Sequence, residues 1–158
     1  MSSKTLSALV RSAVLFAAIC GIIACVSLPS FGSSIVSSFP DQSHLYIPWL
    51  VFLWLTSLPL FMLLTQIWKI STAIKNETVF TLQTARIVRF CAFILFGTSA
   101  FFILGNVLFL LIDMSHPGVL FLALIADVFV IALAVLLAVL SRYLTKAAAL
   151  QEEADGFI

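Results

Sequence analysis

The residue of this sequence best placed to do chemistry is Asp127, because it is the one acidic side chain inside a long apolar run. An Asp at the centre of a membrane helix costs about 2.5–3.5 kcal/mol on insertion, so it is expected to face other helices and to find a polar partner. Asn106 is the first candidate partner, because it and Asp127 lie at nearly equal distances from the polar break at residues 115–116. Thr56 and Ser57 are the alternative candidate partners. A hydrogen bond between helices is favoured over the alternative, a path for protons or ions through Asp127.

A second pattern with possible chemistry is Asp-x-x-His, which occurs twice in short polar segments, as Asp41–His44 and Asp113–His116. Two such pairs could supply four zinc ligands. Short polar loops also contain these residues by chance, so no metal site is predicted and these four residues are weak candidates. No cofactor is expected. No nucleophile with its base, phosphate-binding glycine loop or intramembrane protease motif is recognisable, so the protein is not expected to be an enzyme.

The elements that must position these residues are long apolar helices. The chain has 158 residues, of which 63% are hydrophobic and 9% charged, whereas about a quarter of the residues of a soluble domain are charged. Runs of 18 or more apolar residues are long enough to cross a bilayer, and four occur, at about residues 8–28, 45–67, 90–112 and 118–141. The sequence therefore predicts one all-α integral membrane domain over residues 1–158, with four transmembrane helices in an up-down bundle.

Several local signals mark the ends and contacts of these helices. Residues 29–44 are rich in Ser and Pro and predict either an ordinary loop or a short segment on the membrane surface. Thr81 is a suitable N-cap for the third helix, and Pro117 suits the first turn of the fourth. Gly97 and Gly105 lie inside the third run, where small residues permit close packing of membrane helices.

The charges predict the orientation of the chain in the membrane. All eight Lys and Arg residues fall in the N-terminal segment, the loop 69–89, the tail 142–158 or the helix ends beside them. Because cytoplasmic loops carry an excess of Lys and Arg, both termini and the loop 69–89 are expected in the cytoplasm. Charged residues of this loop and of the tail form the predicted cytoplasmic docking surface: Lys75, Arg86, Arg89, Glu152, Glu153 and Asp155.

The loop and the tail also resemble a known family. The relevant segments are Asn76–Thr81 (NETVFT), followed by Arg86 and Arg89, and Ala149–Asp155 (ALQEEAD). Together with the four spans they resemble the YoaS-like family of small bacterial membrane proteins, domain-of-unknown-function family 2975. The family tail more usually has Asn at the position of Ala154 and Leu-Thr at Gly156–Phe157. The resemblance implies no established activity, but it implies a membrane partner that holds or signals to a cytoplasmic regulator.

The leading functional hypothesis is therefore a multi-pass protein of the bacterial cytoplasmic (inner) membrane with an interaction or regulatory role. It would dock a cytoplasmic regulator or a membrane protein through residues 75–89 and the C-terminal tail, without binding nucleic acid directly. A homo-oligomer is also possible within the lipid bilayer. The alternatives are a small transporter or channel component that uses Asp127, and a metal sensor on the outer face.

Overall fold

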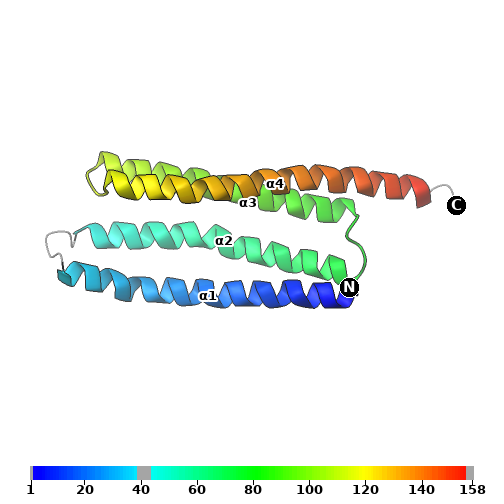
Figure 1. Cartoon of the computed structure of the whole chain (residues 1–158), viewed down its shortest axis with the longest axis horizontal. Coiled ribbons are helices and arrows are strands. Elements are labelled where there is room, and N and C mark those ends of the chain that lie inside the picture. The colour runs from blue at the N-terminus through cyan, green and yellow to red at the C-terminus, as the bar shows by residue number, and fades with distance from the viewer. Residues whose placement is uncertain (1, 39–43, 156–158) are drawn as a thin grey trace.

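The chain folds into long helices joined by short turns. The computed structural model describes residues 2–38 and 44–155, and within these ranges it has four α-helices. These are α1 (Ser3–Ser38), α2 (Tyr46–Lys75), α3 (Leu82–Leu111) and α4 (Pro117–Asp155). Consecutive helices run antiparallel, so α1 begins and α4 ends at the same end of the molecule (Figure 1). By length and composition each helix is able to cross a membrane, which confirms the prediction of an all-α protein with four candidate spans.

The helix ends follow from local chemistry. The Thr81 side chain accepts a hydrogen bond from the Thr84 N–H, which confirms the predicted N-cap of α3. α2 and α3 end alike, with Glu77 and Asp113 in the left-handed region at φ 59° and 55°. In both turns an N–H bonds back five residues: Thr78 to the Ala73 carbonyl and Met114 to the Phe109 carbonyl. This is the Schellman motif, which usually places Gly at the left-handed position.

α1 is longer than the sequence predicted, because it continues through Pro29 to Ser38. A proline inside a helix lacks the N–H that would bond the carbonyl four residues earlier, and here that carbonyl belongs to Cys25. The indole N–H of Trp54 in α2 donates to the Cys25 carbonyl at 3.3 Å. The hydroxyl of Tyr46 donates to the carbonyl of Pro29 itself at 3.2 Å. Side chains of α2 therefore compensate for the proline, and the predicted loop 29–44 is helical up to Ser38.

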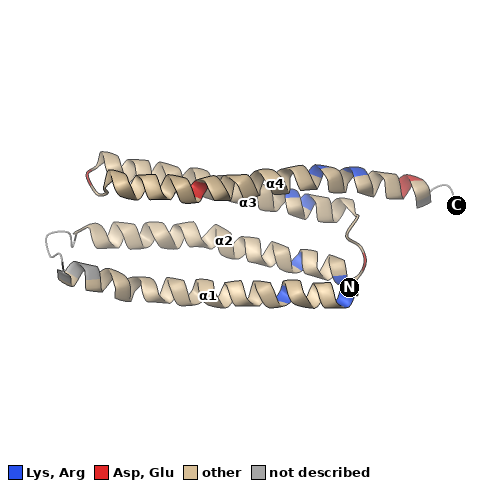
Figure 2. Cartoon of the chain, in the orientation of Figure 1, with Lys and Arg blue, Asp and Glu red and all other residues tan. Residues whose placement is uncertain are grey.

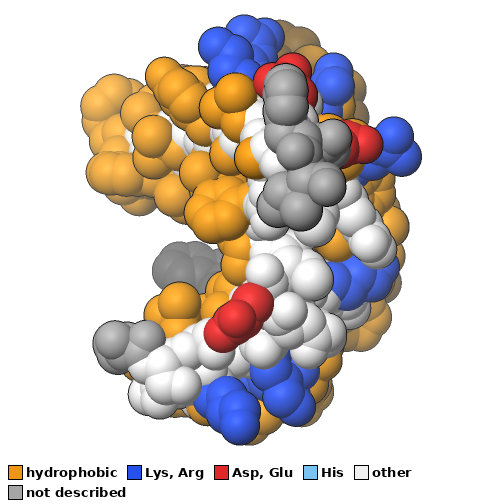
Figure 3. Space-filling view, turned by 90° about the vertical axis from the view of Figure 1, so that its right-hand side faces the viewer, with side chains coloured by type: hydrophobic (Ala, Val, Ile, Leu, Met, Phe, Trp, Pro, Cys, Tyr) orange, Lys and Arg blue, Asp and Glu red, His pale blue; other side chains and the backbone are white. Residues whose placement is uncertain are grey.

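The four helices form an open, curved layer. Backbone contacts join α1 to α2, α2 to α3 and α3 to α4, whereas α1 and α4 make none with each other among the described residues. Seen from the end at which α1 begins, the molecule is C-shaped, with a hollow lined by hydrophobic side chains (Figure 3). The up-down order predicted from the sequence is present, but without the closed packing that is typical of a four-helix bundle.

α3 and α4 form the most extensive helix pair. On each helix, small or polar residues recur at every seventh position and are buried: Ala85, Ala92, Ser99 and Asn106 on α3, and Asp127, Ala134, Ser141 and Ala148 on α4. A seven-residue repeat keeps one face of each helix against its partner. Small residues on that face let the two backbones approach closely in a membrane.

α2 packs against the second half of α3 through aromatic rings. The Phe52 ring lies between those of Trp49, Phe102 and Phe109, at centroid distances of 5.2 to 5.9 Å. Gly105 makes room for this cluster, because a Cβ built on it would collide with the Phe52 ring. Aromatic pairs at such distances add to the energy of burial, so this cluster holds the α1–α2 hairpin against the α3–α4 hairpin.

Candidate functional site

Asp127 is buried between α3 and α4. Its side chain is 2% exposed, and the hydroxyl of Ser99 donates a hydrogen bond to its Oδ2 at 2.6 Å. That distance is in the range of O–H···O bonds to carboxylates. Asp127 therefore faces the neighbouring helix, as the cost of an acid in hydrocarbon requires.

The partner of Asp127 is not the one that the sequence suggested. Asn106 is also buried, at 1% exposed, but its amide donates to the Phe102 carbonyl of its own helix at 2.8 Å. The hydroxyls of Thr56 and Ser57 likewise bond to backbone carbonyls within α2. Among the described residues, Asp127 makes no hydrogen bond to Asn106, Thr56 or Ser57, so the predicted partners are wrong.

The register of the α3–α4 hairpin explains the error. The prediction placed the centre of the turn at residues 115–116, whereas α3 ends at Leu111 and its Schellman turn is complete by Met114. Because α3 and α4 run antiparallel, the Ser99–Asp127 contact places Asn106 opposite Leu120. That pair lies one seven-residue repeat closer to the turn than Ser99 and Asp127 do. The signal that could have identified Ser99 is its place in the seven-residue series of small residues on α3.

The predicted docking residues lie at the cationic end of the molecule. Figure 2 shows Lys and Arg gathered toward the end at which α1 begins and α4 finishes. Lys75, Arg86 and Arg89 are exposed, and the Arg89 guanidinium lies over the ring of Phe93 at 5.7 Å. Of the acidic tail, Glu152 and Glu153 are exposed in the last turns of α4, and the side chain of Asp155 lies outside the described residues.

Polar contacts between α1 and α2 at the same end were not expected from the sequence. Ser7 and Ser71 are buried, and the hydroxyl of each donates to the backbone carbonyl of the other at 3.0 Å. One turn along α1, the Arg11 guanidinium donates to the Thr72 hydroxyl at 3.2 Å and lies 5.1 Å from the centre of the Trp68 ring. Small hydroxyl side chains commonly join membrane helices in this way. These contacts fix the start of α1 against the end of α2.

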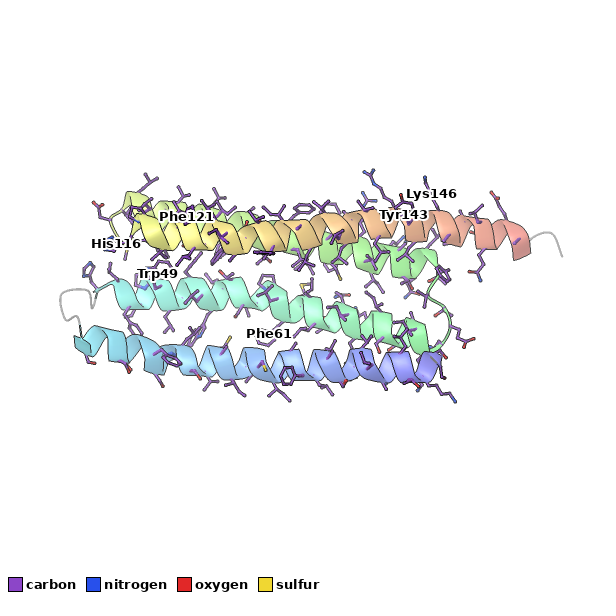
Figure 4. The ribbon with its side chains drawn as sticks, in the orientation of Figure 1. Trp49, Phe61, His116, Phe121, Tyr143 and Lys146 are labelled. Atoms are coloured by element: carbon purple, nitrogen blue, oxygen red, sulfur yellow. The ribbon has the colours of Figure 1, made fainter. Side chains whose placement is uncertain are left out.

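At the opposite end, the Asp/His candidates that the structure describes do not gather into a metal site. Asp113 and His116 lie in the turn between α3 and α4, and His44 lies before α2. Asp41 lies outside the described residues. Among residues 2–38 and 44–155, no three Asp, Glu, His or Cys side chains are close enough together to hold a metal ion. Asp113 and His116 instead border a pocket beside Trp49, and Figure 4 shows His116 and Trp49 at this end.

The comparisons with known proteins agree with the resemblance noted in the sequence. A family model described as "Protein of unknown function (DUF2975)" matches residues 31–158. The chain belongs to this family. The match runs from the last turns of α1 to the end of the chain, so it includes α2, both Schellman turns, the α3–α4 pair and the acidic tail. No curated protein and no solved structure matches the chain.

Proposed function

We propose that this DUF2975 protein is a non-enzymatic, multi-pass protein of the bacterial cytoplasmic membrane with an interaction or regulatory role. Its docking surface consists of residues 75–89 together with the exposed tail of α4. The partner is a cytoplasmic regulator or another membrane protein that contacts the acidic tail through a basic surface.

The observation that carries this proposal is the separation of charge along the molecule. The Lys and Arg residues gather toward one end (Figure 2), and the positive-inside rule assigns that end to the cytoplasm. The start of α1, the end of α4 and the turn between α2 and α3 lie there as well (Figure 1). A partner in the cytoplasm would therefore meet the loop and the tail together.

The length of α4 gives this end a projecting arm. α4 has 39 residues and α3 has 30, and Figure 1 shows α4 extending past the start of α3. In the register of the Ser99–Asp127 contact, Leu82 at the start of α3 is opposite Leu144. The residues beyond Leu144 reach about 16 Å further, at about 1.5 Å per residue. Glu152 and Glu153 are exposed on this arm and have no ion-pair partner among the described residues.

The environment of Asp127 favours this role over transport. Its side chain is 2% exposed and bonded to Ser99 within a row of small residues that brings α3 and α4 together. A titrating group in a transport path needs access to water on each side, and a tightly packed helix interface restricts that access. The buried acid is better explained as part of the helix pair.

Site-specific photo-crosslinking tests the proposal. A photoreactive amino acid is placed at Leu150 of the tail or, as a control, at Phe121 near the other end of α4; these side chains are 66% and 65% exposed. We expect a discrete protein adduct from position 150 in intact cells and none from position 121. The double substitution Glu152→Gln and Glu153→Gln should strongly reduce the adduct, because it removes two of the three acidic side chains of the tail.

A substitution of the same chemical kind at the other end of the molecule separates docking from a general effect of charge. Asp113→Asn also changes an acid to its amide, but in the turn at the opposite end of the molecule, and it should leave the adduct from position 150 intact. An adduct of unchanged yield after loss of both glutamate carboxylates would show that Glu152 and Glu153 do not hold the partner. Adducts of equal yield from positions 150 and 121 would contradict a docking surface at the cationic end.

A further inference from the structure

A candidate site outside the docking surface is a pocket at the opposite end of the molecule. It has a volume of about 750 Å³ and is lined by the last turns of α1, the start of α2, the α3–α4 turn and the start of α4. Because it is lined by residues of both α1 and α4, which make no backbone contact with each other among the described residues, it lies in the hollow between them. Its size is that of pockets that bind small organic molecules.

The walls of the pocket are mostly apolar. Leu28 and Phe31 of α1, Leu53 of α2 and Leu110 of α3 are among the residues that line it. Along α2 the lining runs from Tyr46 to Leu53, a depth of about 10 Å at 1.5 Å per residue. Such walls favour a hydrocarbon chain or another elongated apolar group.

The α3–α4 turn forms a fixed polar end to this pocket. The indole N–H of Trp49 donates to the Met114 carbonyl at 3.1 Å, which ties the turn to α2. The hydroxyl oxygen of Ser115 is buried and has no hydrogen-bond partner among the described residues. Ser115 lines the pocket together with the exposed residues Asp113 and His116. A buried hydroxyl without a partner loses the hydrogen bonds that it would make with water. Rotation of the Ser115 side chain would bring this hydroxyl to a ligand oxygen or N–H at this end and restore one.

We propose that the pocket binds a long-chain amphiphile with an uncharged, hydrogen-bonding head. Its chain lies between α1 and α2, and its head bonds to Ser115 and His116 at the turn. The head is uncharged because the Asp113 carboxylate at the same rim repels an anion, whereas a hydroxyl head can both donate and accept a hydrogen bond. The pocket lies at the opposite end from the docking surface, so this inference does not depend on the proposed function.

Quenching of Trp49 fluorescence tests the binding. The chain has three tryptophans, so Trp54→Phe with Trp68→Phe leaves Trp49 as the reporter, in the full chain reconstituted in nanodiscs of unbrominated phospholipid. Titration with a monoglyceride whose acyl chain carries two bromines should quench Trp49 to a saturating level. A fatty acid with the same brominated chain should bind at least several-fold more weakly, because its head is a carboxylate. Equal affinities would overturn the assignment of an uncharged head.

Two variants test the site itself. Ser115→Ala should weaken binding about threefold to tenfold, the effect of one lost hydrogen bond. Leu53→Phe with Leu110→Phe fills the pocket and should abolish saturable quenching. The matched control, Leu58→Phe with Leu108→Phe, makes the same changes at side chains that are 62% and 57% exposed and should bind normally.

A bilayer made with brominated phospholipid separates a specific ligand from bulk lipid. Quenching that rises in proportion to the brominated fraction and is unchanged in the Ser115 and pocket-filling variants would overturn the proposal, since the pocket would then hold ordinary bilayer lipid. Quenching that saturates with the monoglyceride, and that is lost when the pocket is filled by Leu53→Phe with Leu110→Phe, would support the proposal.

Discussion

The Ser99–Asp127 pair shows how one buried acid can be accommodated inside a membrane helix. Asp127 occupies a position of the α4 series that elsewhere holds Ala134, Ser141 and Ala148, and these small residues bring the α3 backbone close. Ser99 then reaches the carboxylate with a hydrogen bond of 2.6 Å. A bond of this kind contributes only modestly to stability, on average about 0.6 kcal/mol in the best-measured membrane case. Leaving the carboxylate without a donor costs more.

The first prediction follows from the difference between the small gain from this hydrogen bond and the larger cost of losing its donor. Ser99→Ala should lower the free energy of unfolding by about 1–3 kcal/mol, because it leaves a buried acceptor unpaired. Adding Asp127→Ala should recover most of this loss, since alanine continues the series of small residues and removes the acid. Unfolding in mild detergent, arranged as a double-mutant cycle, measures the coupling between the two positions.

Asp127→Asn distinguishes a structural role of Asp127 from a role in transport. The amide can still accept the Ser99 hydrogen bond, so stability should change little. Proteoliposomes of the wild-type protein should show no proton or ion flux above that of empty liposomes. A flux that Asp127→Asn abolishes while the fold survives would assign the acid to transport and contradict its structural role.

At the scale of helices, close approach is limited to particular positions. Gly105 lies where a side chain would collide with the Phe52 ring, whereas a Cβ on Gly97 meets nothing within 4 Å. The sequence suggested that both glycines permit close packing, and the structure supports this only for Gly105. The difference depends on where α2 crosses α3, which the sequence of α3 alone does not specify.

The second prediction uses these two glycines as a matched pair. Gly105→Ala should destabilise the protein by about 1–3 kcal/mol, the usual effect of adding volume to a packed interface. Gly97→Ala should be neutral or stabilising by up to about 1 kcal/mol, because alanine favours the helix and has open space. Thermal unfolding of both variants in the same detergent measures the difference. Equal destabilisation by the two substitutions would contradict the Phe52–Gly105 packing.

The parts of the fold that local sequence determines were predictable, and the parts that depend on distant residues were not. Apolar run lengths located the four helices, and Thr81 marked the start of α3 through a bond to its own first turn. The passage of α1 through Pro29 depends on Trp54, which lies 29 positions from the carbonyl that it satisfies. The partner of Asp127 was missed for a related reason, because an error in the centre of the turn displaces every pair along an antiparallel hairpin.

At the scale of the whole molecule, two ends with different chemistry are joined by an open layer of helices. One end carries the Lys and Arg residues and the projecting acidic end of α4 (Figure 2). The other end carries the apolar pocket beside Trp49 and His116, two residues labelled in Figure 4. α1 and α4 leave hydrophobic side chains facing the hollow between them (Figure 3). In a bilayer, lipid can cover such faces without cost, because lipid tails are as apolar as the side chains. The open form is therefore compatible with a membrane and would be unfavourable in water.

The last prediction concerns the orientation of this molecule, on which the docking surface depends. In a background with Cys20, Cys25 and Cys91 replaced by alanine, Ser37→Cys and Lys75→Cys place single thiols at exposed positions near opposite ends of the helices. A membrane-impermeant maleimide applied to intact cells should label position 37 and not position 75, because the positive-inside rule assigns the cationic end to the cytoplasm. Permeabilised cells should label both positions, which controls for the reactivity of each thiol. Labelling of position 75 in intact cells would place the loop and the acidic tail outside, where no cytoplasmic regulator could reach them.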